Sequence, residues 1–102
     1  MKKIMKEKIV SFELAKLANE IGFLDKTAPT LSLLQSWLLK EKNIFVEILY
    51  DYEYDSTPFH FDIIDINKHV SMMKEDWSAD DTEYDEALEH GLIYCLNLLK
   101  EK

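Results

Sequence analysis

The fold is decided by the stretch IFVEILYDYEYDSTPFHFDIIDI, residues 44–66. In residues 44–54, Ile, Val and Tyr side chains lie on one face, and acidic residues, Phe and Leu lie on the other. Residues 59–66 alternate again. A period of two is typical of a half-buried β-strand, and the segment DSTP between the two runs favours a turn. The stretch therefore predicts an antiparallel pair of strands.

The four-residue connection at 55–58 sets the expected pairing of these strands. It places Tyr54 opposite Phe59, so that aromatic side chains meet on one face of the pair. On the other face it brings together four polar side chains, namely Asp51, Glu53, His60 and Asp62.

Two helices are predicted before the strands. Ser11 and Thr30 are suitable N-cap residues ahead of apolar stripes with helical spacing. Gly22 and Asn43 end these helices, because both residue types accept the left-handed conformation that follows a helix. The stripes comprise Leu14, Leu17, Ala18 and Ile21 in the first helix, and Leu33 or Leu34, Trp37 and Leu38 in the second.

A third helix is predicted near the C-terminus. Thr82 and Asp85 have the spacing of a capping box, and the acids around them favour the positive end of a helix dipole. The last two turns are apolar almost all round, which indicates a helix that is either central to the core or covered by another subunit. The stripe of this helix comprises Tyr84, Leu88, Leu92 (or Gly91), Cys95 and Leu99.

These elements define one small α+β domain over residues 1–102, in which residues 1–10 are expected to be a flexible basic tail. It has two N-terminal helices, an antiparallel β-hairpin or a three-stranded sheet, and a C-terminal helix packed on the sheet. Residues 70–73 decide the strand count, as either a short strand or an irregular crossing. No signal peptide or membrane span is recognisable, and the single cysteine suits a reducing compartment. We expect a cytoplasmic protein without a cofactor.

Charge is separated along the chain. Residues 47–89 contain fourteen acids and two lysines, and the chain has no arginine and a net charge of −8. A strongly negative half repels nucleic acids and anionic membranes and attracts basic partners. Two kinds of nucleic-acid binding are therefore disfavoured, namely stacking of bases on the tyrosines and insertion of the second helix into a DNA groove. Both require a basic surface, which this part of the chain does not provide.

Four segments resemble a known family: LAKLANEIGF at 14–23, APT at 28–30, QSWLLKEKNIFVEI at 35–48 and YDEALEHGL at 84–92. The chain is similar over roughly residues 11–100 to small uncharacterised proteins from Bacteroidetes genomes, phages and prophages. Many members carry a longer, Tyr-rich insert before the position of Pro29. The resemblance implies a phage-derived or mobile-element accessory protein, and it lends no catalytic site.

Three functions remain open, and we favour a non-enzymatic one, in which the chain binds a protein partner or a second copy of itself. The predicted contact residues are Glu75, Asp76, Asp80, Asp81, Ile93 and Leu96. In this reading the acids of residues 75–86 could also imitate a nucleic-acid backbone, as in counter-defence proteins.

The alternatives are a metal-dependent hydrolase or binder and a winged-helix-like regulator. Carboxylates with one imidazole could hold Mg²⁺ or Mn²⁺, and the predicted ligands are Asp51, Glu53, His60 and Asp62. Cys95 and His90 lie on different faces of the last helix, so a buried, inert thiol is expected and no catalytic residue is assigned.

Overall fold

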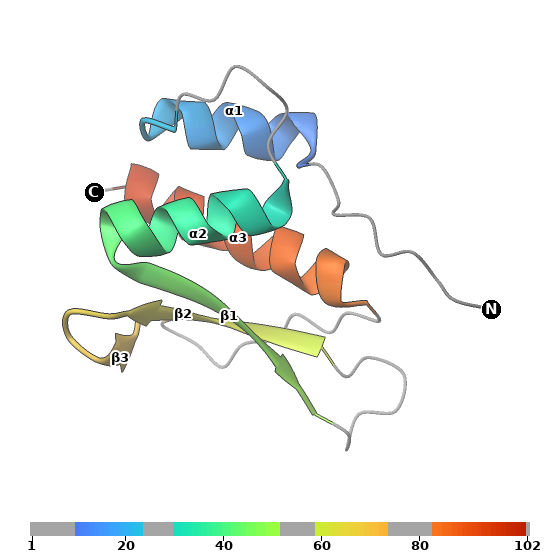
Figure 1. Ribbon diagram of the computed structural model, residues 1–102, viewed down its shortest axis with the longest axis vertical. Coiled ribbons are helices and arrows are strands. Elements are labelled where there is room, and N and C mark those ends of the chain that lie inside the picture. The colour runs from blue at the N-terminus through green and yellow to red at the C-terminus, as the bar shows by residue number, and fades with distance from the viewer. Residues whose placement is uncertain (1–9, 24–29, 52–58, 74–82, 102) are drawn as a thin grey trace.

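The computed structural model describes residues 10–23, 30–51, 59–73 and 83–101. Along the chain these residues form α1 (Phe12–Glu20), α2 (Leu31–Lys42), β1 (Ile44–Tyr50), β2 (Phe59–Asp65), β3 (Val70–Ser71) and α3 (Tyr84–Lys100). The strands form one antiparallel sheet in the order β1-β2-β3, and the helices lie on one side of it (Figure 1). The predicted α+β class is confirmed, with the sheet in its three-stranded form.

The ends of α1 and α2 follow from local sequence signals. The hydroxyls of Ser11 and Thr30 accept hydrogen bonds from backbone N–H groups three residues later, at 3.2 Å in both helices. Gly22 has a φ of +105° and Asn43 a φ of +56°, so each helix ends at a residue in the left-handed region. Phe23 then folds back, because its N–H donates to the Ala18 carbonyl at 3.0 Å.

The third helix is the centre of the core. It contacts α1, α2, β1 and β2, and α1 lies beyond it on the side away from the sheet (Figure 1). This position explains why α3 is apolar on several faces without a covering subunit. The structure assigns its N-cap to Glu83, which makes no side-chain capping bond, in place of the predicted Thr82. The buried residues of α3 are Ala87, Leu88, Gly91, Leu92, Cys95 and Leu96.

The predicted strand register is wrong. Phe59 pairs with Tyr50 rather than with Tyr54, so the observed register differs by four residues from the one that a turn at 55–58 predicted. The observed register sets Val46 against Ile63 on the face that α3 covers, whereas the predicted one would have set Val46 against a polar Asn. A register shift by an even number keeps every side chain on its face, so burial under α3 selects among registers that local turn chemistry cannot distinguish.

Two further expectations concern the chain start and the membrane. Val10, the last residue of the predicted tail, is 8% exposed and belongs to the core; residues 1–9 lie outside the described part. None of the helices in the described ranges is long and apolar enough to cross a bilayer.

Candidate functional site

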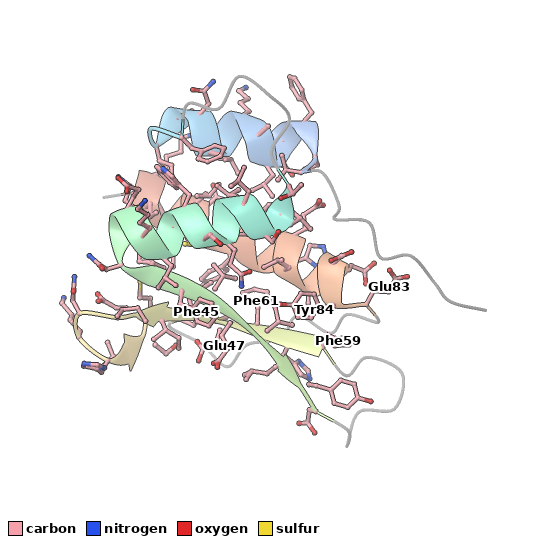
Figure 2. All side chains as sticks on the ribbon, in the orientation of Figure 1. Phe45, Glu47, Phe59, Phe61, Glu83 and Tyr84 are labelled. Carbon is pink, nitrogen blue, oxygen red and sulfur yellow. The ribbon has the colours of Figure 1, made fainter. Side chains whose placement is uncertain are left out.

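Three aromatic rings form a continuous exposed surface where β1 ends and where β2 and α3 begin. The Tyr50 and Phe59 ring centroids are 5.2 Å apart in an edge-to-face arrangement. Phe59 and Tyr84 are 6.2 Å apart with their planes at 87°. Figure 2 shows Tyr84 at the start of α3 close to Phe59. We call these three residues the aromatic surface.

The two tyrosines of this surface are exposed to solvent. Tyr50 is 65% exposed and Tyr84 is 47% exposed, with the half-buried Phe59 between them. Tyrosine is enriched at the energetically dominant positions of protein interfaces, because it supplies a large contact area at low entropy cost. Edge-to-face packing also holds the rings in place before a partner arrives, so the arrangement suits recognition.

Acidic residues flank the aromatic surface in the chain. Asp51 follows Tyr50, while Glu83 and Asp85 stand on either side of Tyr84. Figure 2 shows Glu83 beside Tyr84 at the N-terminal end of α3. Asp85 lies in the first turn of this helix, where a carboxylate interacts favourably with the helix dipole. Asp85 therefore has a structural role, and the acids together make this end of the molecule attractive to cations.

The predicted metal site depended on the wrong register and is not assembled in the described residues. Asp62 lies opposite Glu47, and His60 lies opposite Leu49. Asp62 accepts a hydrogen bond from the Ser71 hydroxyl at 2.6 Å, and His60 is only 2% exposed. Glu53 lies outside the described part of the chain. Within that part, no three His, Cys, Asp or Glu side chains are grouped to hold a metal ion.

The predicted partner-binding residues divide into two groups. Leu96 is completely buried, so its prediction as a contact residue is wrong for the folded monomer. Ile93 is half-buried and packs against the core. Glu75, Asp76, Asp80 and Asp81 lie outside the described residues, and their role stays a prediction.

Two other candidates have structural explanations. Cys95 is completely buried, and burial raises the pKa of its thiol from 9.0 to about 12, so the nucleophilic thiolate is suppressed. Gln35 of α2 also has a structural role, because its amide Nε2 donates to the Val46 carbonyl at 2.6 Å. The buried thiol and the hydrogen-bonded amide therefore support neither a catalytic cysteine nor insertion of α2 into a DNA groove.

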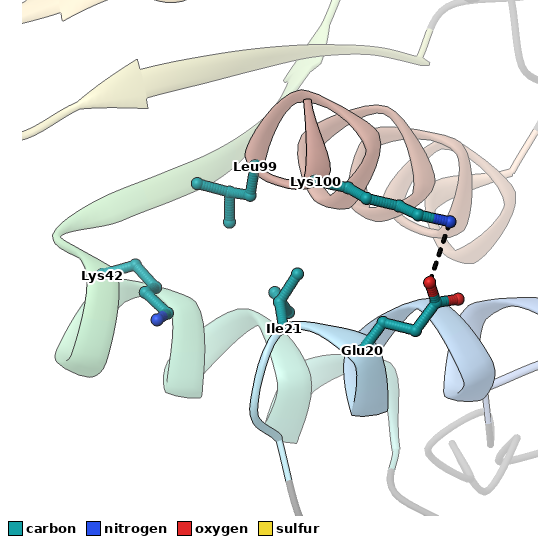
Figure 3. Close-up of a pocket in the computed structure, with 5 residues that line it drawn as sticks. All are labelled: Glu20, Ile21, Lys42, Leu99 and Lys100. Atoms are coloured by element: carbon teal, nitrogen blue, oxygen red, sulfur yellow. Dashed lines mark ion pairs between the residues drawn. The ribbon is translucent and has the colours of Figure 1, made fainter. Parts of the chain in front are cut away.

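An open pocket of about 370 Å³ lies where the three helices end (Figure 3), lined by Glu20, Ile21, Lys42, Leu99 and Lys100. Lys100 Nζ is 2.8 Å from Glu20 Oε2. Helix C-termini carry partial negative charge, which is stabilised by lysine and repels anions. Since α1, α2 and α3 end at Glu20, Lys42 and Lys100, the lysines offset the helix ends, and we assign no ligand to this pocket.

Comparisons of this chain with family models, with curated proteins and with solved structures gave no significant match. The resemblance to phage and prophage proteins therefore stays a prediction.

The sequence interpretation placed Tyr50 and Tyr84 on stripes that face the core. For Tyr50 a partner-binding face was the less favoured alternative, and for Tyr84 no surface role was predicted. Both lie at the ends of their elements, Tyr50 as the last residue of β1 and Tyr84 as the first of α3. The periodicity of a stripe does not indicate where the covering layer stops. The signal that could have identified them is their adjacency to Asp51, Glu83 and Asp85.

Proposed function

We propose that this chain is a non-enzymatic interaction domain that binds a basic protein segment through the aromatic surface. The observation that carries the proposal is the exposure of Tyr50 and Tyr84 on both sides of Phe59, with contacts between successive rings. Such rings can form the apolar centre of an interface. The phage or mobile-element setting implied by the family resemblance is compatible with binding to a host protein.

The negative charge around the aromatic surface indicates what kind of partner would bind there. The aromatic surface lies among residues of the negative block, 47–89. A second copy docking there would bring two negative surfaces together, which is unfavourable, whereas a segment rich in lysine or arginine is attracted. Cations also bind favourably over the faces of tyrosine rings. A basic segment of another protein therefore fits better than a homodimer.

The test is a titration of the isotope-labelled chain with a blocked peptide, Lys-Val-Lys-Val-Lys-Val-Lys, followed by NMR. We expect shift changes concentrated at Tyr50, Phe59 and Tyr84, and binding that weakens steeply between low and high salt. A peptide with Glu in place of Lys should not bind. The proposal fails if the two peptides bind equally, or if neither binds at low salt.

A matched pair of variants distinguishes binding at the aromatic surface from non-specific binding to exposed apolar side chains. Tyr84→Ala should weaken binding of the lysine peptide about tenfold or more. Leu33→Ala is the control, because Leu33 is an apolar side chain of α2 with 46% exposure, close to the 47% of Tyr84. Equal effects of the two substitutions would contradict the proposal.

A further inference from the structure

The backbone of β1 has one edge that pairs with β2 and one that does not. The Ile66 N–H donates to the Asn43 carbonyl at 2.9 Å, which sets the phase of the antiparallel ladder. Hydrogen-bonded pairs recur at every second residue, so Phe45, Glu47 and Leu49 bond toward β2. The residues whose N–H and C=O groups point to the other edge are Ile44, Val46, Ile48 and Tyr50.

A second bond confirms this phase. Ile63 is paired with Val46, and its carbonyl accepts from the Met72 N–H at 2.7 Å, on the side away from β1. The Val46 backbone must then point outward in the opposite direction. Among the described residues, β1 pairs with β2 alone and forms one edge of the sheet.

One side chain covers part of this edge. Gln35 reaches from α2 and donates its Nε2–H to the outward carbonyl of Val46 at 2.6 Å. Natural sheets protect exposed edges by such coverage, because a bare row of N–H and C=O groups pairs with other chains. Beyond Val46 the edge continues through Ile48 and Tyr50, and Tyr50 belongs to the aromatic surface. Among the residues that the structure describes, this coverage of the β1 edge reaches Val46 and no farther toward Tyr50.

We propose that the partner segment binds as an extended strand antiparallel to β1, added to the edge of β1 that does not pair with β2, beside Ile48 and Tyr50. This inference rests on the proposed function and specifies the form of the ligand. Strand addition supplies affinity through main-chain hydrogen bonds and selectivity through alternate side chains. The added strand places every second side chain beside Glu47 on the sheet face away from the helices, and the others beside Ile48 and Tyr50.

This geometry defines the ligand chemistry. A lysine or arginine directly across from Glu47 makes a favourable cross-strand charge pair, and an apolar residue next in sequence meets Ile48. A second copy is disfavoured, because pairing would bring together two surfaces from the negative block 47–89, and the register symmetric about Glu47 would also set two carboxylates side by side. The preferred occupant is a segment in which basic and apolar residues alternate.

Backbone methylation of the peptide probe tests the strand geometry. In the bound Lys-Val-Lys-Val-Lys-Val-Lys peptide the valines face the helices, so their N–H groups point to β1 and those of the lysines point to solvent. N-methylation of the valines should lower affinity at least tenfold, while N-methylation of the lysines should leave it within about twofold. Equal loss or no loss for both peptides would overturn strand addition.

Amide hydrogen exchange gives a second readout on the unmodified chain. The amides of Ile48 and Tyr50 should exchange rapidly in the free protein and at least tenfold more slowly in the complex. If the peptide shifts Tyr84 but leaves both exchange rates unchanged, the proposed function stands and strand addition is refuted. If Ile48 is protected without peptide and the chain sediments as a dimer, the occupant is a second copy and the proposal is wrong.

The coverage by Gln35 is tested by mutation. Gln35→Ala exposes the Val46 carbonyl and should tighten peptide binding about two- to tenfold, the usual value of one hydrogen bond. Ser36→Ala, an exposed substitution in the same helix, is the control and should change nothing. Unchanged or weakened binding by Gln35→Ala would contradict a partner strand that extends along β1 to Val46.

Discussion

Gly91 of α3 lies directly against Val46 of β1: a Cβ atom at position 91 would stand 2.8 Å from Val46 Cγ1. The same Cβ would be 3.1 Å from the Cβ and Cγ of Phe61. The contact distance between the central helix and the sheet is therefore set by a residue without a side chain. Ordinary van der Waals contact requires a separation several tenths of an ångström larger.

Gly91→Ala should consequently lower the free energy of unfolding by about 1–3 kcal/mol, the usual cost of overpacking a core. Alanine gains about 1 kcal/mol in helix propensity over glycine, but Val46 is β-branched and cannot rotate freely away. Urea denaturation measures the change, with Ser36→Ala as an exposed helical control. A Gly91→Ala variant as stable as the wild type would show that α3 packs farther from the sheet.

Leu96 and Ile93 should respond differently to truncation. Leu96→Ala removes a completely buried side chain and should cost about 2–5 kcal/mol. Ile93→Ala removes a half-buried one, so we expect a smaller loss. Thermal and urea unfolding of both variants provide the comparison. Equal small losses would restore Leu96 as a surface residue, contrary to its position in the core.

Cys95 should be inert in the folded chain and should make stability fall at alkaline pH. Burial raises the pKa of its thiol from 9.0 to about 12. Below pH 9 the thiol is protonated in both states, so its contribution to stability is fully present. Between pH 9 and about 12 the unfolded chain loses the proton while the folded chain retains it, and that contribution is lost.

Two measurements check this behaviour of Cys95. Iodoacetamide at pH 8 should modify the thiol far more slowly in buffer than in urea. Cys95→Ala should flatten the part of the stability curve above pH 9 that belongs to the thiol. Rapid modification without denaturant would mean that position 95 opens readily to solvent.

The ion pair between α1 and α3 should give a small acid-side dependence. The hydrogen bond from Lys100 lowers the pKa of the Glu20 carboxyl from 4.5. Desolvation opposes this shift, and the charges of Lys100 and Lys16 add to it. A lowered pKa stabilises the fold above pH 4.5, and this contribution is lost as the pH falls through the lowered value. Because the carboxyl is exposed, solvent screening keeps the effect small.

Glu20→Gln tests this pair. The variant should differ from the wild type near pH 7 at low salt and converge with it at acidic pH, and 1 M NaCl should remove most of the difference. Stability curves by urea denaturation at several pH values provide the measurement. A difference that persists unchanged in high salt would indicate that packing of Glu20, rather than its charge, is responsible.

Local signals predicted the helices of this fold well. The hydroxyls of Ser11 and Thr30, with Gly22 and Asn43 at the other ends, act within a few residues of chain. Their effect depends on backbone geometry that does not require the rest of the molecule. The same holds for the alternation in residues 44–66, which correctly placed Val46, Phe61 and Ile63 in the core.

These local signals did not predict the interactions between segments that are distant in the sequence. The predicted cluster of Asp51, Glu53, His60 and Asp62 was based on a register that the structure contradicts, and Glu53 lies outside the described residues. Which acids of two strands come together depends on the pairing of those strands. The surface role of Tyr84 was also missed, since it depends on where the sheet and helix layers end.

The amino-acid sequence by itself determined the α+β class, the helix ends, the faces of the strands and the concentration of negative charge, because these depend on residue type and short spacing. Only the tertiary structure decided the pairing of Tyr50 with Phe59, the burial of Leu96 and the free edge of β1. The physical reason is that registers differing by an even number of residues share the same alternation. Packing of α3 on Val46 and Phe61 selects one of them.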